Sequence, residues 1–305
     1  MSNLTITTLD LYDNLIEHNG AQELSESLKT NSTLTTLLLG YNAIGINGTN
    51  LTLTTLDLSN NSIEDDGAQA LSESLKTNST LTTLLLGHNS IEDNGVRALS
   101  EALKVNSTLT TLNIEFNPIG SYGFRSPYGT CKANSTLATL NLGSSLIGFE
   151  GAQALSEALK TNSTLRTLNL SRDLISASGA QALSEALMTN STITTLDLGF
   201  NSIGSEGAQA LSAALKSNSH LSILRLHNNS IRCRGVQALS SALKTNSTLT
   251  TLDLSCNSIG LLGAQALSEA LKINSTLTIL YLRKTSIGER GAQAIHQPGN
   301  RKRVS

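Results

Sequence analysis

The 305-residue chain contains no tryptophan, and aromatic residues make up only 3% of it. A hydrophobic core must therefore be built from aliphatic side chains that stack in a regular way. Charged residues account for 14%, a low share for a globular protein. The surface must accordingly be rich in hydroxyl and amide groups.

Excess charge is also missing, since the formal net charge is −2. This value argues against non-specific nucleic-acid binding, which depends on a basic surface. The charges are nevertheless unevenly distributed: residues 1–130 carry 5 Lys and Arg against 14 Asp and Glu, and residues 131–305 carry 16 against 9. We therefore expect an acidic first half and a basic second half.

Cysteine is scarce: Cys131, Cys233 and Cys256 form no CxxC pair and leave one over. A disulfide framework is not expected, and reduced thiols are typical of a cytosolic protein. The N-terminus lacks the basic and apolar regions of a signal peptide, and no apolar run reaches the roughly 18–20 residues that cross a bilayer. We predict a cytoplasmic protein without a membrane partner, in which the many Asn-x-Ser/Thr triplets are parts of a repeat rather than glycosylation sites.

An internal repeat governs the sequence. An aliphatic residue opens an LxxLxL phrase every 28 residues, except for one interval of 19 residues between Leu34 and Leu53. The opening residues are Ile6, Leu34, Leu53, Leu81, Leu109, Leu137, Leu165, Ile193, Leu221, Leu249 and Leu277. Eleven copies of one structural unit, each here called a coil, are therefore predicted.

A well-formed coil begins at Leu249 and reads LTTLDLSCNSIGLLGAQALSEALKINST. Leucines alternate with polar residues in LTTLDL, the pattern of a half-buried strand. Ala, Leu and Leu in GAQALSEAL share one helical stripe. The turn residue Asn257 is expected to bond backbone groups of its own and adjacent coils, and Asn274 to end the helix in a left-handed conformation.

Strands joined by helical crossovers must be parallel. Strands lie about 4.8 Å apart, whereas helices need about 8–10 Å, so the stack should curve with its helices outside. We expect eleven strands near Leu9–Leu11, Leu37–Leu39, Leu56–Leu58 and each later equivalent. Helices are predicted at about 21–29, 68–76, 95–103, 151–159, 179–187, 207–215, 235–243 and 263–271, with a shorter piece near 291–296.

The phrase LTTLDLxxNSIGxxGAQALSEALKxNS resembles the ribonuclease-inhibitor-like class of leucine-rich repeats, which also forms the arrays of NOD-like receptors and the body of Ran GTPase-activating proteins. The resemblance covers residues 4–296. It implies an α/β leucine-rich-repeat solenoid, or horseshoe, with a parallel inner sheet and an outer layer of helices. We expect one domain over residues 1–296 and a disordered basic tail over residues 297–305.

Two coils depart from the pattern. The second lacks the GAQALSEALK phrase, and the fifth reads GSYGFRSPYGTC where a helix should run. Because Gly and Pro disfavour helices, no full-length helix is expected at 45–52 or 123–131. Both departures spare the strands, and they are either specialised loops or drift in a tolerant layer, with an imperfect gene model as a further alternative for the short second coil. On the turn-Asn ladder, Ser145, Asp173 and Thr285 replace Asn, and the ladder should be weakest there.

Catalytic and metal-binding motifs are missing. The sequence has no phosphate-binding loop, GxGxxG, HExxH or zinc spacing, and its five histidines fall at unrelated repeat phases. Asp10, Asp57, Asp197 and Asp253 share a strand position, but no two belong to consecutive coils, so they cannot form a paired-carboxylate site. We predict no enzymatic activity, no cofactor and no metal.

Comparison of the coils shows where side chains vary. Variation concentrates at the fifth, seventh and eighth places of each coil, counted from the opening aliphatic residue, and these places point out from the inner sheet. Exposed aromatic and Arg residues on a concave surface are typical of binding hot spots, although free drift would also explain the variation. The predicted partner-binding residues are Tyr41, His88, Phe116, Arg172, Phe200, Arg225, Tyr281, Arg283 and Lys284.

These observations favour a non-enzymatic protein-binding scaffold, or ligand-recognition array, that uses its concave face. The partner is expected to be a protein or peptide, acidic where it meets the C-terminal half, and not a nucleic acid. The resemblance leaves two alternatives open: a GTPase-activating regulator of the Ran type, and the sensor array of a NOD-like receptor.

Overall fold

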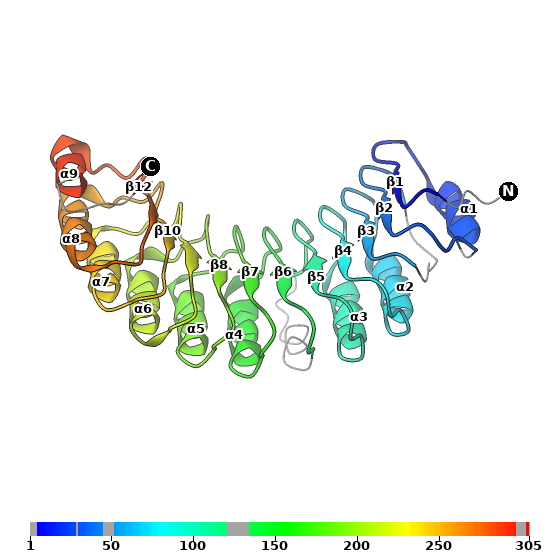
Figure 1. Ribbon diagram of the computed structural model, residues 1–305, viewed down its shortest axis with the longest axis horizontal. Coiled ribbons are helices and arrows are strands. Elements are labelled where there is room, and N and C mark those ends of the chain that lie inside the picture. The colour runs from blue at the N-terminus through cyan, green and yellow to red at the C-terminus, as the bar shows by residue number, and fades with distance from the viewer. Residues whose placement is uncertain (1–4, 29, 45–51, 121–133, 297–302, 305) are drawn as a thin grey trace. The chain divides into compact units, whose positions relative to one another are not determined.

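A computed structural model describes residues 5–28, 30–44, 52–120, 134–296 and 303–304. The chain divides into two compact units, here called the N-terminal unit (Met1–Leu146) and the C-terminal unit (Ile147–Ser305). In each unit short strands alternate with helices, and the helices lie on one side of the strands (Figure 1).

The elements of the N-terminal unit are β1 (Thr8–Asp10), α1 (His18–Leu28), β2 (Thr36–Leu38), β3 (Thr55–Asp57), α2 (Asp65–Leu75), β4 (Thr83–Leu85), α3 (Asp93–Leu103), β5 (Thr111–Asn113) and β6 (Thr139–Asn141). Those of the C-terminal unit are α4 (Gly148–Leu159), β7 (Thr167–Asn169), α5 (Ala177–Leu187), β8 (Thr195–Asp197), α6 (Gly204–Ser217), β9 (Ile223–Arg225), α7 (Cys233–Leu243), β10 (Thr251–Asp253), α8 (Gly260–Ile273), β11 (Ile279–Tyr281), α9 (Gly288–Ile295) and β12 (Arg303–Val304).

Within each unit, consecutive strands pair in parallel and in the register of the repeat. Thr8 lies opposite Thr36, for example, and Thr251 lies opposite Ile279. The eleven predicted strands are thus present, each beginning one residue earlier than expected. The pairing of β2 with β3 and of β5 with β6 keeps this register across both irregular coils, so the prediction that these coils spare the strands is confirmed.

Aliphatic residues at fixed repeat places build the core. In the coil that opens at Leu249, the strand leucines, Ile259 and the helix residues Ala264 and Leu267 have no exposed surface. Burial of each Leu or Ile stabilises the fold by about 1.5–3 kcal/mol. The alternating strand pattern and the helical stripe are both confirmed.

Most helices begin about three residues before their predicted starts. The sequence pattern places the glycine of the GAQAL phrase at the helix start, but this glycine lies within the first turn, where neighbouring side chains and the preceding helix come close. A Cβ on Gly207 would lie 2.5 Å from Ile203 Cγ2 and 3.0 Å from Ala180 Cβ. The glycine at this place is therefore required by packing, whereas Gly204, with φ +62°, is the one that the turn requires.

The predicted asparagine ladder is present. Asn257 Nδ2 donates to the carbonyl oxygens of Leu226 and Leu254 at 2.8 and 3.0 Å, and its Oδ1 accepts from the N–H groups of Asn229 and Ile231. One buried side chain thus ties two coils together.

The replaced ladder positions make different contacts. Ser145 Oγ donates to the Ile114 carbonyl oxygen at 3.3 Å, and Thr285 Oγ1 donates within its own coil to Leu282 at 2.6 Å. Asp173 is fully buried, and the guanidinium of the adjacent Arg172 lies over the Phe200 ring. The side chain of Thr285 therefore gives its coil a local bond in place of the bond between coils that Asn257 makes.

A second row of asparagines, at the Asn-Ser-Thr triplets, also joins neighbouring coils. Asn274 is 6% exposed, and its Nδ2 donates to the carbonyl oxygens of Leu243 and Asn246 at 2.8 and 3.0 Å. The expectation that Asn274 adopts a left-handed conformation is wrong, because its φ is −66°. Its side chain ends the helix by accepting hydrogen bonds from the N–H groups of Thr276 and Leu277.

The predictions for the two segments without a full helix and for the C-terminal tail can be compared with the structure only where their residues are described. Of the segments predicted to lack a full helix, residues 45–51 and 123–131 lie outside the described residues. In the tail predicted to be disordered, Arg303–Val304 form β12, which pairs in parallel with β11. Residues 297–302 and 305 lie outside the described part of the chain.

Candidate protein-binding face

We call the side chains at the fifth, seventh and eighth places of the coils the strand face of each unit. All eleven residues at the eighth place adopt left-handed backbone conformations, with φ between +52° and +60°. Most of their N–H groups continue the hydrogen-bonded ladder: that of Phe200, for example, donates to the His227 carbonyl oxygen at 2.8 Å. The ladder therefore fixes the left-handed turn that sets the direction of each eighth side chain.

Left-handed geometry costs an L-residue about 1–2 kcal/mol, and Gly, Asn and Asp tolerate it best. The chain nevertheless places tyrosine, histidine, phenylalanine, arginine and lysine at this position. Strained residues of this kind cluster at functional sites. The conformation thus makes the large side chains of the eighth row candidates for binding.

Acidic and amide side chains at the fifth place have a local task. Asp197 Oδ1 accepts from the Gly199 N–H at 2.9 Å, and Asp253 Oδ1 accepts from the Ser255 N–H at 2.9 Å. These bonds shape the turn that follows each strand. The second carboxylate oxygen remains available for contacts between coils.

The seventh place supplies slots for neighbouring side chains. Gly199 lies under the imidazole of His227, since a Cβ on Gly199 would lie only 2.1 Å from His227 Cε1. The absence of a side chain at Gly199 therefore lets His227 lie against the backbone of the preceding coil.

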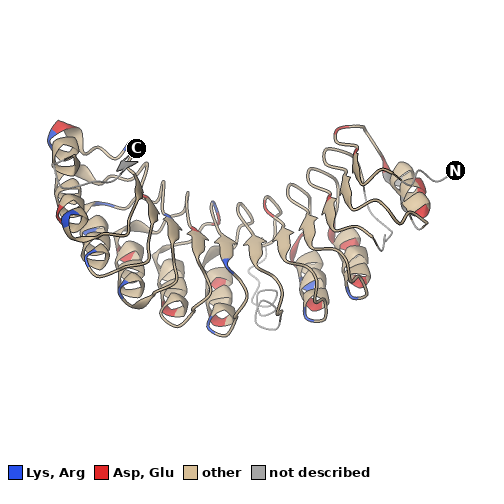
Figure 2. Cartoon of the chain, viewed as in Figure 1, with Lys and Arg blue, Asp and Glu red and all other residues tan. Residues whose placement is uncertain are grey.

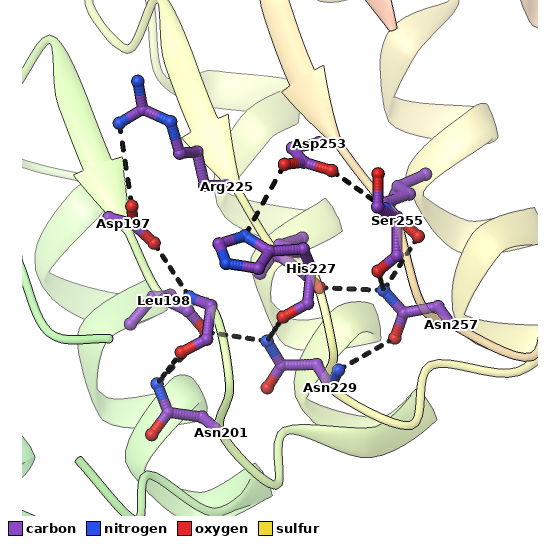
Figure 3. Close-up of polar contacts among 12 residues, drawn as sticks. Asp197, Leu198, Asn201, Arg225, His227, Asn229, Asp253, Ser255 and Asn257 are labelled. Atoms are coloured by element: carbon purple, nitrogen blue, oxygen red, sulfur yellow. Dashed lines mark hydrogen bonds and ion pairs between the residues drawn. The ribbon is translucent and has the colours of Figure 1, made fainter. Parts of the chain in front are cut away.

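Around His227, the strand face of the C-terminal unit holds a connected group of side chains. The Arg172 guanidinium lies 3.9 Å from the centre of the Phe200 ring, whose centre is 4.9 Å from that of the His227 ring. His227 Nδ1 lies 3.6 Å from Asp253 Oδ2, an ionic contact when the imidazole is protonated. Figure 3 shows this contact beside that of Arg225 with Asp197.

An open cavity of about 380 Å³ adjoins this group. Two cations and the His227–Asp253 contact are among the groups that line it. Its lining consists of His227, Asp253, Ser255, Cys256, Tyr281, Arg283 and Lys284. The cavity can receive a polar or charged side chain from a partner.

On the N-terminal unit, the strand face carries two aromatic pairs. Tyr12 and Tyr41 lie with ring centres 4.9 Å apart, and His88 stacks on Phe116 with ring centres 4.0 Å apart and planes at 12°. Burial raises the pKa of Tyr12, as do Tyr41 and the carboxylates of Asp13 and Asp57. The Tyr12–Tyr41 pair is therefore in an acidic environment.

The predicted partner-binding residues thus fall into two groups. Tyr41, His88 and Phe116 lie on the strand face of the N-terminal unit. The C-terminal unit brings together Arg172, Phe200, Arg225, Tyr281, Arg283 and Lys284. Residues that the sequence did not single out as partner-binding are Tyr12, Asp197, His227 and Asp253.

Charge is concentrated on the helices in both units (Figure 2). Several lysines at the C-terminal ends of helices pair with glutamates three residues earlier, as Lys160 does with Glu157 at 2.6 Å. The described residues contain no group of three or more His, Cys, Asp or Glu side chains that could hold a metal ion. Within the same residues, no helix combines the length and apolar character that crossing a membrane requires.

Stacked strand–helix coils with a varied strand face define a repeat solenoid, an architecture suited to binding. The family model of the leucine-rich repeat matches residues 49–72, 77–100, 105–123, 161–184, 189–212, 245–268 and 274–295, which together exceed half of the chain. The chain therefore belongs to the leucine-rich repeat family, and its fold is an α/β leucine-rich-repeat solenoid.

Solved structures include similar chains. An internalin from Listeria monocytogenes is 17% identical, with a TM-score of 0.55 over 98% of this chain and 86% of that one. The actin-binding site 2 of leiomodin-1 is 30% identical over 41% of this chain and 75% of that one, with a TM-score of 0.36. No curated protein matches the chain. Leucine-rich-repeat proteins generally serve as protein-binding scaffolds, and the fold points to binding rather than catalysis.

Proposed function

We propose that the protein is a non-enzymatic scaffold whose C-terminal unit binds an acidic protein or peptide on its strand face. The stack of Arg172, Phe200 and His227 is the observation that carries this proposal. Arg and aromatic residues contribute disproportionately to interface energies. Phe200 is 40% exposed although it packs against both neighbours, so a partner can still cover it.

Preorganisation supports the proposal. Stacking on Phe200 restricts the rotamers of Arg172 before any partner arrives, and less side-chain entropy is then lost on binding. The planar guanidinium can offer two parallel N–H donors to a carboxylate. Arg172 is thus suited to receive an Asp or Glu side chain.

Local charge favours an anionic partner. The strand face of this unit carries Arg172, Arg225, Arg283 and Lys284 against Asp197 and Asp253. Asp197 lies 3.7 Å from Arg225, whose side chain is 42% exposed. The Asp197 side chain is 17% exposed, so the pair is partly exposed and contributes on the order of 1 kcal/mol, and a partner carboxylate can replace Asp197. Binding should weaken as salt is added.

Four finer assignments accompany this function. The 28-residue coil, with 11–14 residues in each of the helices α1–α8, supports membership of the ribonuclease-inhibitor-like class. Free Cys233 and Cys256 and the engaged Asn-Ser-Thr asparagines are consistent with a cytoplasmic location. A protein ligand is favoured over nucleic acid because the first half of the chain is acidic. One domain over residues 1–296 is expected to unfold in a single cooperative transition, which calorimetry would test.

The test, once a partner has been identified, is a binding assay that compares the parent with the triple variant Arg172→Ala, Arg225→Ala, Lys284→Ala. A matched control removes three cations from the C-terminal ends of helices: Lys216→Ala, Lys244→Ala, Lys272→Ala. We expect the first variant to lose most binding and the second to retain it, with both folding normally. Equal binding by the first variant and the parent at low and moderate salt would refute the proposed site.

A further inference from the structure

The strand face of the N-terminal unit has the opposite charge. Its six coils place Asp10, Asp13, Asp57 and Glu115 at the fifth, seventh and eighth places, and no Lys or Arg occupies any of these places. The described cations of this unit lie on helices or at their C-terminal ends and already have partners: Lys76 contacts Glu73, Lys104 contacts Glu101, and Arg97 donates to Asn94. Within the described part of this unit, these cations are therefore engaged elsewhere and do not pair with the carboxylates of the strand face.

One aromatic pair on this face is rigidly held yet accessible. The Tyr12 ring lies over Gly40, where a Cβ would lie 2.9 Å from two ring carbons. Its other neighbour is the tilted Tyr41 ring. Tyr12 is 49% exposed and Tyr41 is 50% exposed. Two π-faces are thus offered to solvent beside the carboxylates that affect the Tyr12 hydroxyl.

The other pair is also accompanied by a fixed carboxylate. Phe116, stacked on His88, is 44% exposed. The adjacent Glu115 accepts from Asn113 Nδ2 at 3.1 Å through Oε1 and from Asn141 Nδ2 at 2.8 Å through Oε2. These two amide donors fix the carboxylate on the strand face, one residue before Phe116 in the chain, with no cation taking part in either bond.

We propose that the strand face of the N-terminal unit is a second interaction surface, which binds a cationic segment of a protein partner through its Arg or Lys side chains. Those side chains pack on the Tyr12–Tyr41 and His88–Phe116 pairs and approach the carboxylates of Asp13 and Glu115. An aromatic face next to a carboxylate is attractive to a cation and unattractive to an anion. The surface is independent of the basic site on the C-terminal unit.

The arrangement of the pairs indicates a spacing for the cations. Tyr41 and His88 are separated by two coil steps, about 10 Å at the spacing of adjacent strands. A polyproline II segment returns to the same face every three residues, over about 9 Å. A peptide with a cation at every third position therefore suits the surface.

In the experiment, the 305-residue chain is titrated at low salt with a blocked nonapeptide of three Arg-Pro-Pro triplets, and isothermal calorimetry measures the affinity. Tyr12→Leu with Tyr41→Leu removes the π-faces but keeps apolar side chains, and we expect affinity to fall about tenfold. Tyr12→Phe with Tyr41→Phe should stay within about twofold of the parent, because the π-faces remain. Circular dichroism checks that each variant folds.

Matched controls separate this site from general electrostatics. Asp13→Asn should weaken binding, whereas Asp66→Asn, the same change of charge at the start of α2, should not. The triple variant of the basic site should bind the peptide like the parent, so failure of one proposal does not affect the other. Equal binding by the Tyr→Leu pair, or an equal loss with Asp66→Asn, overturns the proposal. Self-association that the Tyr→Leu pair abolishes also overturns it, since the occupant would then be a second copy.

Discussion

Gly199→Ala should destabilise the C-terminal unit through one side chain, that of His227. The added Cβ would lie 2.1 Å from Cε1, 2.4 Å from Nε2 and 2.6 Å from Nδ1 of the imidazole. Because optimal carbon contacts are about 3.5–4.0 Å, the ring must move by roughly 1.5 Å. That movement disrupts the contacts of His227 with Phe200 and Asp253.

The expected cost follows from two opposing effects. Overpacking of this kind destabilises the fold by about 1–3 kcal/mol. Replacing glycine also restricts the unfolded chain, which stabilises the fold by about 0.4–1 kcal/mol. We therefore expect the free energy of unfolding, measured by urea titration, to fall by about 1–2 kcal/mol. Gly87→Ala is the matched control at the same repeat place, where the nearest contact is the flexible Glu115 Cγ at 3.2 Å.

A double-mutant cycle isolates the cause. In a His227→Ala background the clash is absent, so Gly199→Ala should be neutral or slightly stabilising there. An identical loss of stability with and without the imidazole would show that the slot at Gly199 has another role and that the account of His227 is wrong.

Two further predictions concern the backbone and a buried carboxylate. Gly204→Ala should cost about 1 kcal/mol from backbone conformation alone, because φ is +62° and nothing lies within 4 Å of an added Cβ; an unchanged unfolding midpoint would contradict this. Asp93 is 5% exposed, and neither of its carboxylate oxygens has a hydrogen-bond partner among the described residues. Burial, followed by Asp65 and Glu92, raises its pKa, so the folded state holds the proton more tightly and stability is lost as pH rises above the usual value of 3.8. Asp93→Asn should stabilise the protein at pH 7, with a gain that shrinks toward pH 4; a gain independent of pH would contradict this.

Sequence reasoning predicts the regular parts of this fold well because each coil repeats the same burial pattern. The strand leucines and Asn257 needed no knowledge of neighbouring coils to be placed. The helix starts are predicted a few residues too late because the glycine of GAQAL can be either a turn residue or a point of close packing. Only the packing of neighbouring helices shows that Gly207 has the second role.

The candidate site was predicted less completely for a related reason. Comparison of the same place in successive coils singles out Arg172 and Phe200 by their residue type. The contact of His227 with Asp253 joins the seventh place of one coil to the fifth place of the next, and a comparison of identical places does not reveal such a contact. A glycine at the seventh place followed one coil later by a large side chain, as with Gly199 and His227, is the signal that would have found it.

Photo-crosslinking tests most directly whether the strand face of the C-terminal unit binds the partner. Benzoylphenylalanine would replace Phe200 in one variant and Phe149, on α4, in another. The two side chains are matched controls, being 40% and 41% exposed. The account predicts that the partner crosslinks at position 200 and not at position 149. Crosslinking at 149 alone, or equally at both positions, would contradict it.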